Sequence, residues 1–329
     1  MSAVYVSRPL PAPGPDALVA AGLEVEQNPH DRPPTRDELL AGLQGKQALL
    51  CLLTERIDGD VLDAAPELRI IANLAVGYDN VDVAAASERG VVVTNTPDVL
   101  TDATAELTWA LILAAARRVV EGDALVRGGQ WKGWSPTQLL GVSLTGKTLG
   151  IFGMGKIGAA VARRARGFQM SVVYTNRTRN EAVEAEIGAR FVPFDELLER
   201  SDVLTIHAPS TPETRHVIDA AALARMRPGA ILVNTARGPL VDEVALVTAL
   251  QSSRLAVAGL DVFEREPELA AGLTELANVV LLPHLGSATA EARGAMVELC
   301  CRNILAVLAG EPPLTAVNLT PVKKARSRG

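Results

Sequence analysis

The sequence of 329 residues lacks the features that mark several classes of protein. Its three cysteines, Cys51, Cys300 and Cys301, are too few for a disulfide framework and have no CxxC spacing. No apolar run approaches the roughly 18 residues that a membrane-spanning helix requires, and the first residues do not have the pattern of a secretory signal. We therefore expect a soluble, cytoplasmic protein with reduced thiols and without a metal site or a membrane partner.

Positive charge is not in excess either. Lys and Arg number 32 and Asp and Glu number 38, which gives a net charge of −6. Nucleic-acid binding depends on clustered cations that neutralise phosphates, so we expect no nucleic-acid partner. The C-terminal tail has four basic residues, which we expect to be solvated: Lys323, Lys324, Arg326 and Arg328. The expected partners are small molecules.

Short apolar runs rich in Val, Ile and Leu alternate with helix-length segments along most of the chain. Continuous apolar runs, as opposed to alternating ones, favour parallel strands that are buried on both faces. The strands expected on this basis are 2–6, 48–53, 69–73, 91–94, 148–152, 171–175, 202–206, 230–234, 256–260 and 279–282. Strands that alternate with helices predict an α/β fold with parallel sheets.

Two breaks in this pattern suggest where domains divide. The turn sequence from Thr94 to Asp98 ends one strand before a long helix that begins near Thr101. From 107 to about 118 this helix is almost uncharged, so we expect it to be central in a domain or buried at an interface. A second break, at 283–289, precedes a last helix at 291–308. The periodicity would allow 1–97 and 98–287 to be separate units, and it does not decide where the last helix docks.

The strongest local motif is a glycine-rich loop, Gly153-Met154-Gly155-Lys156-Ile157-Gly158. The loop follows an expected strand and begins an expected helix, which is the context that a dinucleotide fingerprint requires. Gly153 permits a tight turn, Gly155 lets the backbone approach a pyrophosphate, and Gly158 lets the helix pack on the strand. The helix N-terminus offers N–H groups and a positive dipole end to the phosphates.

The end of the next strand indicates which dinucleotide is preferred. An NAD site would place Asp or Glu there to hold the ribose 2′-hydroxyl, but the sequence is Asn176-Arg177-Thr178. An arginine with flanking Asn and Thr offers charge and donors to a 2′-phosphate, whereas an Asp would repel it. We therefore expect NADP(H) to be preferred, with NAD(H) as the second cofactor. The alternative is that Arg177 is a surface residue in a polar turn.

Three residues suited to the reduction of a 2-oxo acid follow three expected strands: Arg237, Glu266 and His284. Ligands bind α/β sheets in the loops after the carboxyl ends of parallel strands. A guanidinium binds a substrate carboxylate and polarises the carbonyl group. An imidazole, whose ordinary pKa is near neutrality, can protonate the developing alkoxide, and a neighbouring carboxylate stabilises its cationic form. Each residue taken singly also has an ordinary structural explanation.

These motifs, in this order, resemble the D-isomer-specific 2-hydroxyacid dehydrogenases over nearly the whole chain. The segments that carry the resemblance are 76–80 (VGYDN), 94–106, the glycine loop, 234–238, 259–267 and 283–289. The segment 95–102 (NTPDVLTD) is similar to the glyoxylate/hydroxypyruvate reductase branch. The resemblance implies two Rossmann-like or flavodoxin-like domains with parallel sheets. The cofactor domain (98–287) would be inserted into a discontinuous substrate domain (1–97 plus 288–329).

The resemblance also implies roles for individual residues, with Arg237, Glu266 and His284 as the catalytic residues. Asp261 would orient the nicotinamide carboxamide. The other residues expected at the cofactor are the glycine loop, Asn176, Arg177, Thr178, Thr104, His207, Pro209, Thr235, Ala236 and Gly286. Those expected at the substrate are the backbone of Val76 and Gly77, the guanidinium of Arg237, and Leu52, whose leucine-rich segment suggests a small pocket.

A tryptophan in the expected loop after the uncharged helix also has a counterpart in the family. Trp134 matches a residue that reaches the partner subunit's active site in related reductases, which implies a homodimer. From the sequence alone, Trp134 is equally well explained as a core aromatic residue.

We expect an NADP(H)-preferring reductase of small 2-oxo acids, which converts glyoxylate to glycolate and hydroxypyruvate to D-glycerate with His284 as proton donor. One alternative is another D-2-hydroxyacid dehydrogenase, of the phosphoglycerate or D-lactate type. A second alternative, from a different class, is a dinucleotide-sensing corepressor or scaffold. The sequence does not rank glyoxylate against hydroxypyruvate, and it does not give the physiological direction of the reaction.

Overall fold

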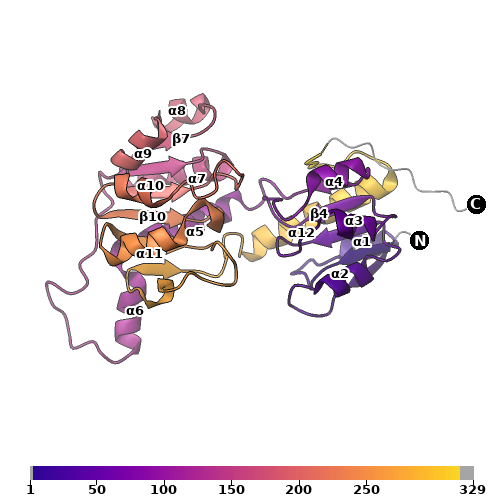
Figure 1. Cartoon of the computed structure of the whole chain (residues 1–329), viewed down its shortest axis with the longest axis horizontal. Coiled ribbons are helices and arrows are strands. Elements are labelled where there is room, and N and C mark those ends of the chain that lie inside the picture. The colour runs from indigo at the N-terminus through magenta and orange to yellow at the C-terminus, as the bar shows by residue number, and fades with distance from the viewer. Residues whose placement is uncertain (1–2, 319–329) are drawn as a thin grey trace, which may run out of the picture. The chain divides into compact units, whose positions relative to one another are not determined.

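The computed structural model describes residues 3–318 and divides the chain into two compact units (Figure 1). The first unit is formed by 1–100 together with 287–329, and the second by 101–286. The chain therefore leaves the first unit after Leu100 and returns to it after Gly286. The basic tail, from Lys323 to Arg328, lies outside the described residues.

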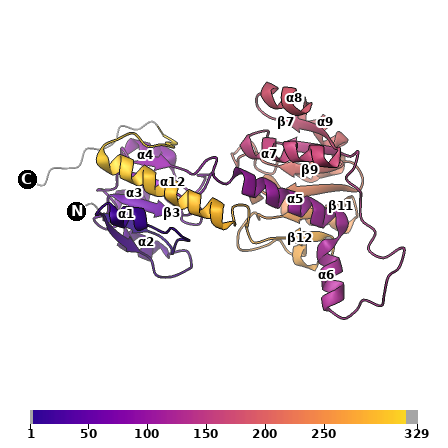
Figure 2. The same ribbon diagram turned by 180° about the vertical axis from the view of Figure 1, so that it is seen from behind.

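The first unit is built on a five-stranded parallel sheet in the order β2-β1-β3-β4-β5. Its strands are β1 (Ala3–Val6), β2 (Glu24–Gln27), β3 (Ala48–Cys51), β4 (Ile70–Asn73) and β5 (Val92–Thr94). Its helices are α1 (Asp16–Ala20), α2 (Arg36–Gly42), α3 (Gly59–Asp63), α4 (Val83–Glu88) and α12 (Ala290–Ala309). Helix α12 packs across β3, β4 and β5, with α1 beside it (Figure 2), while apolar residues of α2, α3 and α4 join the core on the other face.

The second unit is built on a seven-stranded parallel sheet in the order β12-β11-β10-β9-β6-β7-β8. Its strands are β6 (Thr148–Phe152), β7 (Ser171–Thr175), β8 (Arg190–Phe191), β9 (Val203–Ile206), β10 (Ala230–Asn234), β11 (Leu255–Leu260) and β12 (Val279–Leu281). Strand order runs one way from β6 to β8 and the other way from β9 to β12. This reversal between β6 and β9 is the switch point at which open α/β sheets bind ligands.

Helices cover both faces of the second sheet. They are α5 (Thr101–Arg117), α7 (Lys156–Ala165), α8 (Glu181–Ile187), α9 (Phe194–Arg200), α10 (Ala220–Arg225) and α11 (Glu243–Gln251), while α6 (Val119–Arg127) lies outside the sheet layers. Short 3₁₀ turns are formed by Arg166–Phe168, Gly238–Leu240 and Leu273–Glu275. One core cluster lies under α5 and α7, and a second lies under α9, α10 and α11.

Local sequence explains where many of these elements begin and end. Seven helices start at a side chain that accepts a backbone N–H of the first turn: Thr35, Asp58, Asp82, Asn180, Asp219, Asp242 and Thr289. The central strands are continuous apolar runs that are buried along their length, as β3, β4 and β10 show. The predicted α/β fold with parallel sheets is confirmed. Within residues 3–318, no helix has the length and apolar character to span a membrane.

Two strands were not predicted, and both lie at sheet edges. Strand β2 has the sequence Glu-Val-Glu-Gln and is only half-buried, because one of its sides has no neighbouring strand. Strand β8 has two residues, both exposed. Neither has the apolar run that identifies a central strand. The three cysteines are buried free thiols.

The almost uncharged segment of the long helix is explained by its position in the second unit. Helix α5 packs against α7 and against β10 and β11. Trp109 is buried there, donates Nε1–H to the Val161 carbonyl at 3.1 Å, and stacks on Phe168 with ring centroids 4.5 Å apart. The helix is therefore central in its unit.

The segment after α5 has a different character. Arg118 adopts a left-handed conformation (φ 52°) that separates α5 from α6, and α6 has no buried residue. We call 119–143 the arm, because it extends away from the body of the second unit (Figure 1). Trp134 in the arm is 83% exposed and Trp131 is 53% exposed. Trp134 is therefore not a core aromatic residue.

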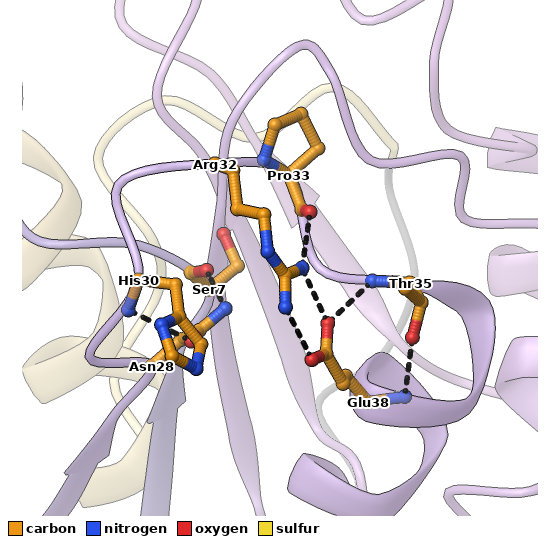
Figure 3. A network of polar contacts seen from close by, with 7 residues as sticks. All are labelled: Ser7, Asn28, His30, Arg32, Pro33, Thr35 and Glu38. Carbon is orange, nitrogen blue, oxygen red and sulfur yellow. Dashed lines mark hydrogen bonds and ion pairs between the residues drawn. The ribbon is translucent and has the colours of Figure 1, made fainter.

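A polar network ties down the loop between β2 and α2 (Figure 3). Asn28 donates Nδ2–H to the Ser7 carbonyl at 3.0 Å, which joins the ends of β1 and β2. Glu38 accepts both terminal nitrogens of Arg32, at 2.6 and 2.7 Å, and also the backbone N–H of Thr35. These hydrogen bonds, those from Arg32 first, lower the pKa of Glu38 to about 2.

Candidate active site

The glycine loop follows β6, and its three glycines have different surroundings. Gly153 has φ 101°, and a Cβ there would lie 2.5 Å from the Ala208 nitrogen and 2.6 Å from the His207 carbonyl carbon. A Cβ on Gly158 would overlap the Gly153 carbonyl oxygen. A Cβ on Gly155 would meet nothing within 4 Å. Packing therefore explains Gly153 and Gly158, whereas Gly155 borders open space.

The start of α7 fits a bound diphosphate. Its N-cap is Gly155, and no side chain caps the helix, unlike α10 and α11, which Asp219 and Asp242 cap. An uncapped helix N-terminus directs backbone N–H groups and the positive end of the dipole outward. The open space at Gly155 leaves room for phosphate oxygens to approach the backbone. Of the other loop residues, Met154 is buried, Ile157 is half-buried and Lys156 is exposed.

The predicted 2′-phosphate residues form a turn after β7. Asn176 donates Nδ2–H to the Thr178 carbonyl at 3.1 Å, and the side chain of Arg177 is exposed. Asn180, which sequence reasoning missed, caps α8 and donates Nδ2–H to the Met154 carbonyl at 3.1 Å. This hydrogen bond joins the turn to the glycine loop, so the two predicted cofactor segments lie side by side.

His207 and Pro209 belong to the segment that follows β9, next to the switch point. The His207 N–H donates to the Phe152 carbonyl at 2.7 Å, and the ring Nε2 lies 2.9 Å from Thr205 Oγ1. Burial lowers the pKa of His207 to about 3, so its ring is neutral at physiological pH. The Pro209 carbonyl accepts the Thr214 hydroxyl at 2.8 Å. The backbone of this segment therefore packs against the glycine loop.

Arg237 is held by the end of β10. The buried Asn234 side chain accepts the Ala236 N–H at 3.0 Å and donates to the Arg237 carbonyl at 2.9 Å, which fixes the turn between them. Arg237 Nη1 donates to the Ala236 carbonyl at 2.8 Å. Sequence reasoning did not assign this role to Asn234.

Two of the residues expected to line the cofactor are joined through Thr108, a residue that sequence reasoning missed. Thr108 Oγ1 donates to the Thr104 carbonyl at 2.8 Å and lies 2.9 Å from Thr235 Oγ1. Thr104 is also close to Gly286, since a Cβ on that glycine would lie 3.6 Å from the Thr104 side chain. Helix α5 thereby contacts the loops that follow β10 and β12.

Glu266 and His284, two of the three residues expected to be catalytic, are in direct contact. Glu266 Oε2 lies 2.9 Å from His284 Nδ1, and their side chains are 32% and 26% exposed. Burial opposes ionisation of Glu266, but His284, the Phe263 N–H and the charge of Arg237 outweigh it and hold the pKa of Glu266 below its ordinary value. The structure thus brings the carboxylate, the imidazole and the guanidinium into one electrostatic environment.

Asp261, directly after β11, supports the loop that carries His284. His284 adopts φ 55°, a left-handed conformation that non-glycine residues rarely take. Its N–H donates to the Asp261 carbonyl at 2.9 Å, and the Asp261 carboxylate accepts the N–H groups of Leu285 and Gly286. Asp261 is fully buried, and this burial raises its pKa. The predicted bond to the nicotinamide carboxamide stays a prediction.

The residues expected at the substrate from the first unit lie at the carboxyl ends of β3 and β4. Each has its backbone carbonyl bound by an asparagine side chain. Asn95 donates Nδ2–H to the Val76 carbonyl at 2.8 Å, Asn73 donates to the Gly77 carbonyl at 2.9 Å, and Asn80 donates to the Leu52 carbonyl at 3.0 Å. These asparagines fix the backbone of the turns, a role that sequence reasoning did not assign to them.

Comparison with known proteins identifies a matching family and similar proteins. Residues 109–286 match the family described as D-isomer specific 2-hydroxyacid dehydrogenase, NAD binding domain. A glyoxylate reductase from Thermococcus gammatolerans is 51% identical over 324 residues, which are 97% of this chain and 97% of that protein. The match therefore extends over both units.

Solved structures have the same fold over nearly their whole length. The TT0316 protein from Thermus thermophilus is 47% identical, with a TM-score of 0.90 over 96% of this chain and 100% of that chain. An NADPH-dependent glyoxylate/hydroxypyruvate reductase from Sinorhizobium meliloti, solved in complex with NADP and malonate, is 36% identical. Its TM-score is 0.85 over 98% of each chain.

Proposed function

The chain belongs to the D-isomer-specific 2-hydroxyacid dehydrogenase family, in its glyoxylate reductase branch, and from this we propose that it reduces glyoxylate and hydroxypyruvate with a nicotinamide dinucleotide. The observation that carries the proposal is the 2.9 Å contact between Glu266 and His284, with the charge of Arg237 acting on the same carboxylate. A proton donor with its carboxylate partner and a carboxylate-binding cation are the groups that this reduction needs.

The three side chains have different roles in the proposed reaction. Arg237 binds the substrate carboxylate and polarises the carbonyl group. His284 in its protonated form gives a proton to the oxygen of the developing alkoxide. Glu266 stabilises the imidazolium and fixes the ring through Nδ1, which leaves Nε2 to face the substrate. The dihydronicotinamide, when bound, supplies the hydride to the carbonyl carbon.

The first unit supplies the remaining substrate contacts in this proposal. The backbone at Val76 and Gly77 holds the substrate carboxylate, and Leu52 limits the size of the group on the other side of the carbonyl. The asparagine contacts to these backbone carbonyls support the proposal, because they fix the turns that would bind the substrate. In this proposal, 1–97 plus 288–329 form the substrate domain and 98–287 form the cofactor domain.

We propose NADP(H) as the preferred cofactor, with NAD(H) as the second. Asn176, Arg177 and Thr178 contain no carboxylate that would repel a 2′-phosphate, and Arg177 is exposed at the turn beside the glycine loop. The glycine loop, Thr104, His207, Pro209, Thr235, Ala236, Asp261 and Gly286 would line the rest of the dinucleotide.

A homodimer is proposed through the arm. Beside the two exposed tryptophans, the arm has exposed apolar side chains at Val119, Val120, Val126 and Leu140. A cluster of large apolar side chains on a protruding segment favours burial against another protein surface. In this arrangement Trp134 reaches the active site of the partner subunit.

The test uses the purified full-length chain and follows the absorbance of NADPH with a series of 2-oxo acids. We expect turnover of glyoxylate and hydroxypyruvate, and loss of most turnover in His284→Ala with NADPH binding retained. Near-normal turnover by His284→Ala would reject the assigned proton donor. Preference for phosphohydroxypyruvate or pyruvate would favour the phosphoglycerate or D-lactate type, and dinucleotide binding without turnover would favour a sensor.

A further inference from the structure

We propose that Glu243, Glu264 and His216 are positioning residues that anchor the loop carrying Glu266. We call residues 262–270 the carboxylate loop. This inference rests on the proposed function, since it concerns the alignment of the residues that would carry out the reduction. None of the three anchoring residues is among those expected to touch the substrate or the cofactor.

Glu243 fastens the carboxylate loop at two places. It lies in the first turn of α11 and is buried. Its Oε1 accepts the Glu264 N–H at 2.7 Å, and its Oε2 accepts the Ala270 N–H at 3.2 Å. These two N–H groups flank Glu266 in the sequence, so one carboxylate holds the segment on both sides of the residue that pairs with His284.

Glu264 connects the carboxylate loop to the segment that follows β9. Its side chain is 15% exposed and accepts Arg215 Nη2 at 2.6 Å and His216 Nε2 at 2.8 Å. His216 is held by its backbone N–H, which donates to the Pro239 carbonyl at 2.8 Å. The residue adopts a left-handed conformation, with φ 50°. The contact therefore joins the carboxylate loop to a backbone segment adjacent to Arg237.

The peptide between Phe263 and Glu264 is where these contacts meet the catalytic residues. Gly238, the residue after Arg237, packs directly on this peptide, and a Cβ on Gly238 would overlap it. The Phe263 N–H donates to Glu266 Oε1 at 3.0 Å, which leaves Oε2 for His284. Displacement of this peptide would move the Glu266 carboxylate and the turn of Arg237 together.

The consequence for catalysis follows from geometry. Glu266 orients His284 only while Oε2 stays within hydrogen-bond distance of Nδ1. A displacement of about 1 Å at a catalytic group can reduce rate by roughly 10²-fold. We therefore expect loss of the anchors to lower kcat while the KM for NADPH, whose proposed contacts lie at the glycine loop, stays unchanged.

The experiment compares Glu264→Gln and His216→Gln with the wild-type chain. Glu268→Gln is the matched control, since Glu268 is an exposed carboxylate in the same loop. We expect kcat for glyoxylate to fall by about ten-fold or more in the two anchor variants, within the range that misplacement of catalytic groups produces. The KM for NADPH should stay at the wild-type value in both variants, since their contacts lie away from the glycine loop. Wild-type kcat in both anchor variants would overturn the inference.

A second measurement does not depend on turnover. Hydrogen exchange at the amides of Phe263 and Glu264 should accelerate in the anchor variants and in Glu243→Gln, but not in Glu268→Gln. Unchanged exchange in Glu264→Gln and His216→Gln would overturn the anchoring. Accelerated exchange in a chain that reduces no 2-oxo acid would support the anchoring and overturn only the proposed function. If Glu243→Gln does not fold, the other two variants decide the question.

Discussion

The carboxylate of Asp261 accepts the backbone N–H of Gly286 at 2.8 Å, and its other oxygen accepts the N–H of Leu285 at 2.6 Å. These are charge-assisted bonds inside a fully buried site. They hold the loop that places His284 in its left-handed conformation. The position of the proposed proton donor therefore depends on a carboxylate that lies behind it.

We expect Asp261→Asn to disturb both stability and turnover. The amide has one acceptor oxygen in place of two, so a backbone N–H of the loop would face an NH₂ group. An unsatisfied buried polar group costs about 1–3 kcal/mol, and denaturation by urea should show a loss of this size. The kcat should fall as well. A variant with wild-type stability and kcat would contradict the supporting role of Asp261.

Gly155 and Gly158 should respond differently to the same substitution. Gly158→Ala would force a Cβ against the Gly153 carbonyl, and overpacking of this kind costs about 1–3 kcal/mol. Gly155→Ala meets nothing within 4 Å in the folded chain, so its stability should stay near that of the wild type. Its dinucleotide affinity should fall, because the added methyl group occupies the proposed approach of the pyrophosphate.

Thermal unfolding and titration with NADPH, monitored by fluorescence, separate these two effects. Gly167→Ala is a suitable control, since a Cβ there also meets nothing within 4 Å and the residue lies outside the proposed site. Full NADPH affinity in Gly155→Ala would show that the phosphates lie elsewhere.

The proposed cofactor preference depends on Arg177. Arg177→Asp removes a charged donor and adds a charge that repels a 2′-phosphate, whereas NADH has no such group. Hydrogen bonds to charged groups contribute about 1.5–3 kcal/mol, which corresponds to a rise in the KM for NADPH of roughly 10- to 100-fold. The KM for NADH should stay level or fall. Arg200→Asp on α9 controls for the change in net charge, and unchanged discrimination in Arg177→Asp would place the 2′-phosphate at another site.

The Arg32–Glu38 network of Figure 3 predicts a pH-dependent contribution to stability. The pKa of Glu38 is about 2 in the folded chain against an ordinary value of 4.5. A carboxylate with a depressed pKa stabilises the folded state above its unfolded pKa, and this contribution is lost as pH falls toward the folded value. Glu38→Gln should therefore lower the Tm at neutral pH, and the difference from the wild type should shrink as pH falls from about 4.5 to about 2. A difference in Tm that is constant with pH, or equal to that of Glu67→Gln, would contradict this origin.

The parts of the fold that could be predicted are those in which the local sequence determines the secondary structure. The apolar runs predicted the central strands, and the glycine loop was identified from its spacing and its position after β6. Strands β2 and β8 were missed because edge strands do not need a continuous apolar run. The sequence left open whether Trp134 is buried, since exposure depends on what packs around a residue.

The supporting residues of the candidate site could not be predicted, because they act between distant segments. Thr108 and Thr235 are 127 positions apart, and Glu243 and Glu264 are 21 apart. A single sequence has no local pattern that pairs them. Asn180 has a recognisable pattern as a helix N-cap, but its bond to Met154 depends on how β6 and β7 align in the sheet.

Because its three thiols are buried, the folded chain can be labelled selectively at a cysteine that is introduced on its surface. Burial raises the pKa of Cys51 and Cys300, and it raises that of Cys301 to about 11, so little reactive thiolate exists at neutral pH. Alkylating reagents should therefore modify the native protein slowly and the unfolded protein quickly. In the variant Trp134→Cys, the exposed thiol in the arm would react before the three buried ones. A spectroscopic probe attached at this position would report directly on whether two copies associate.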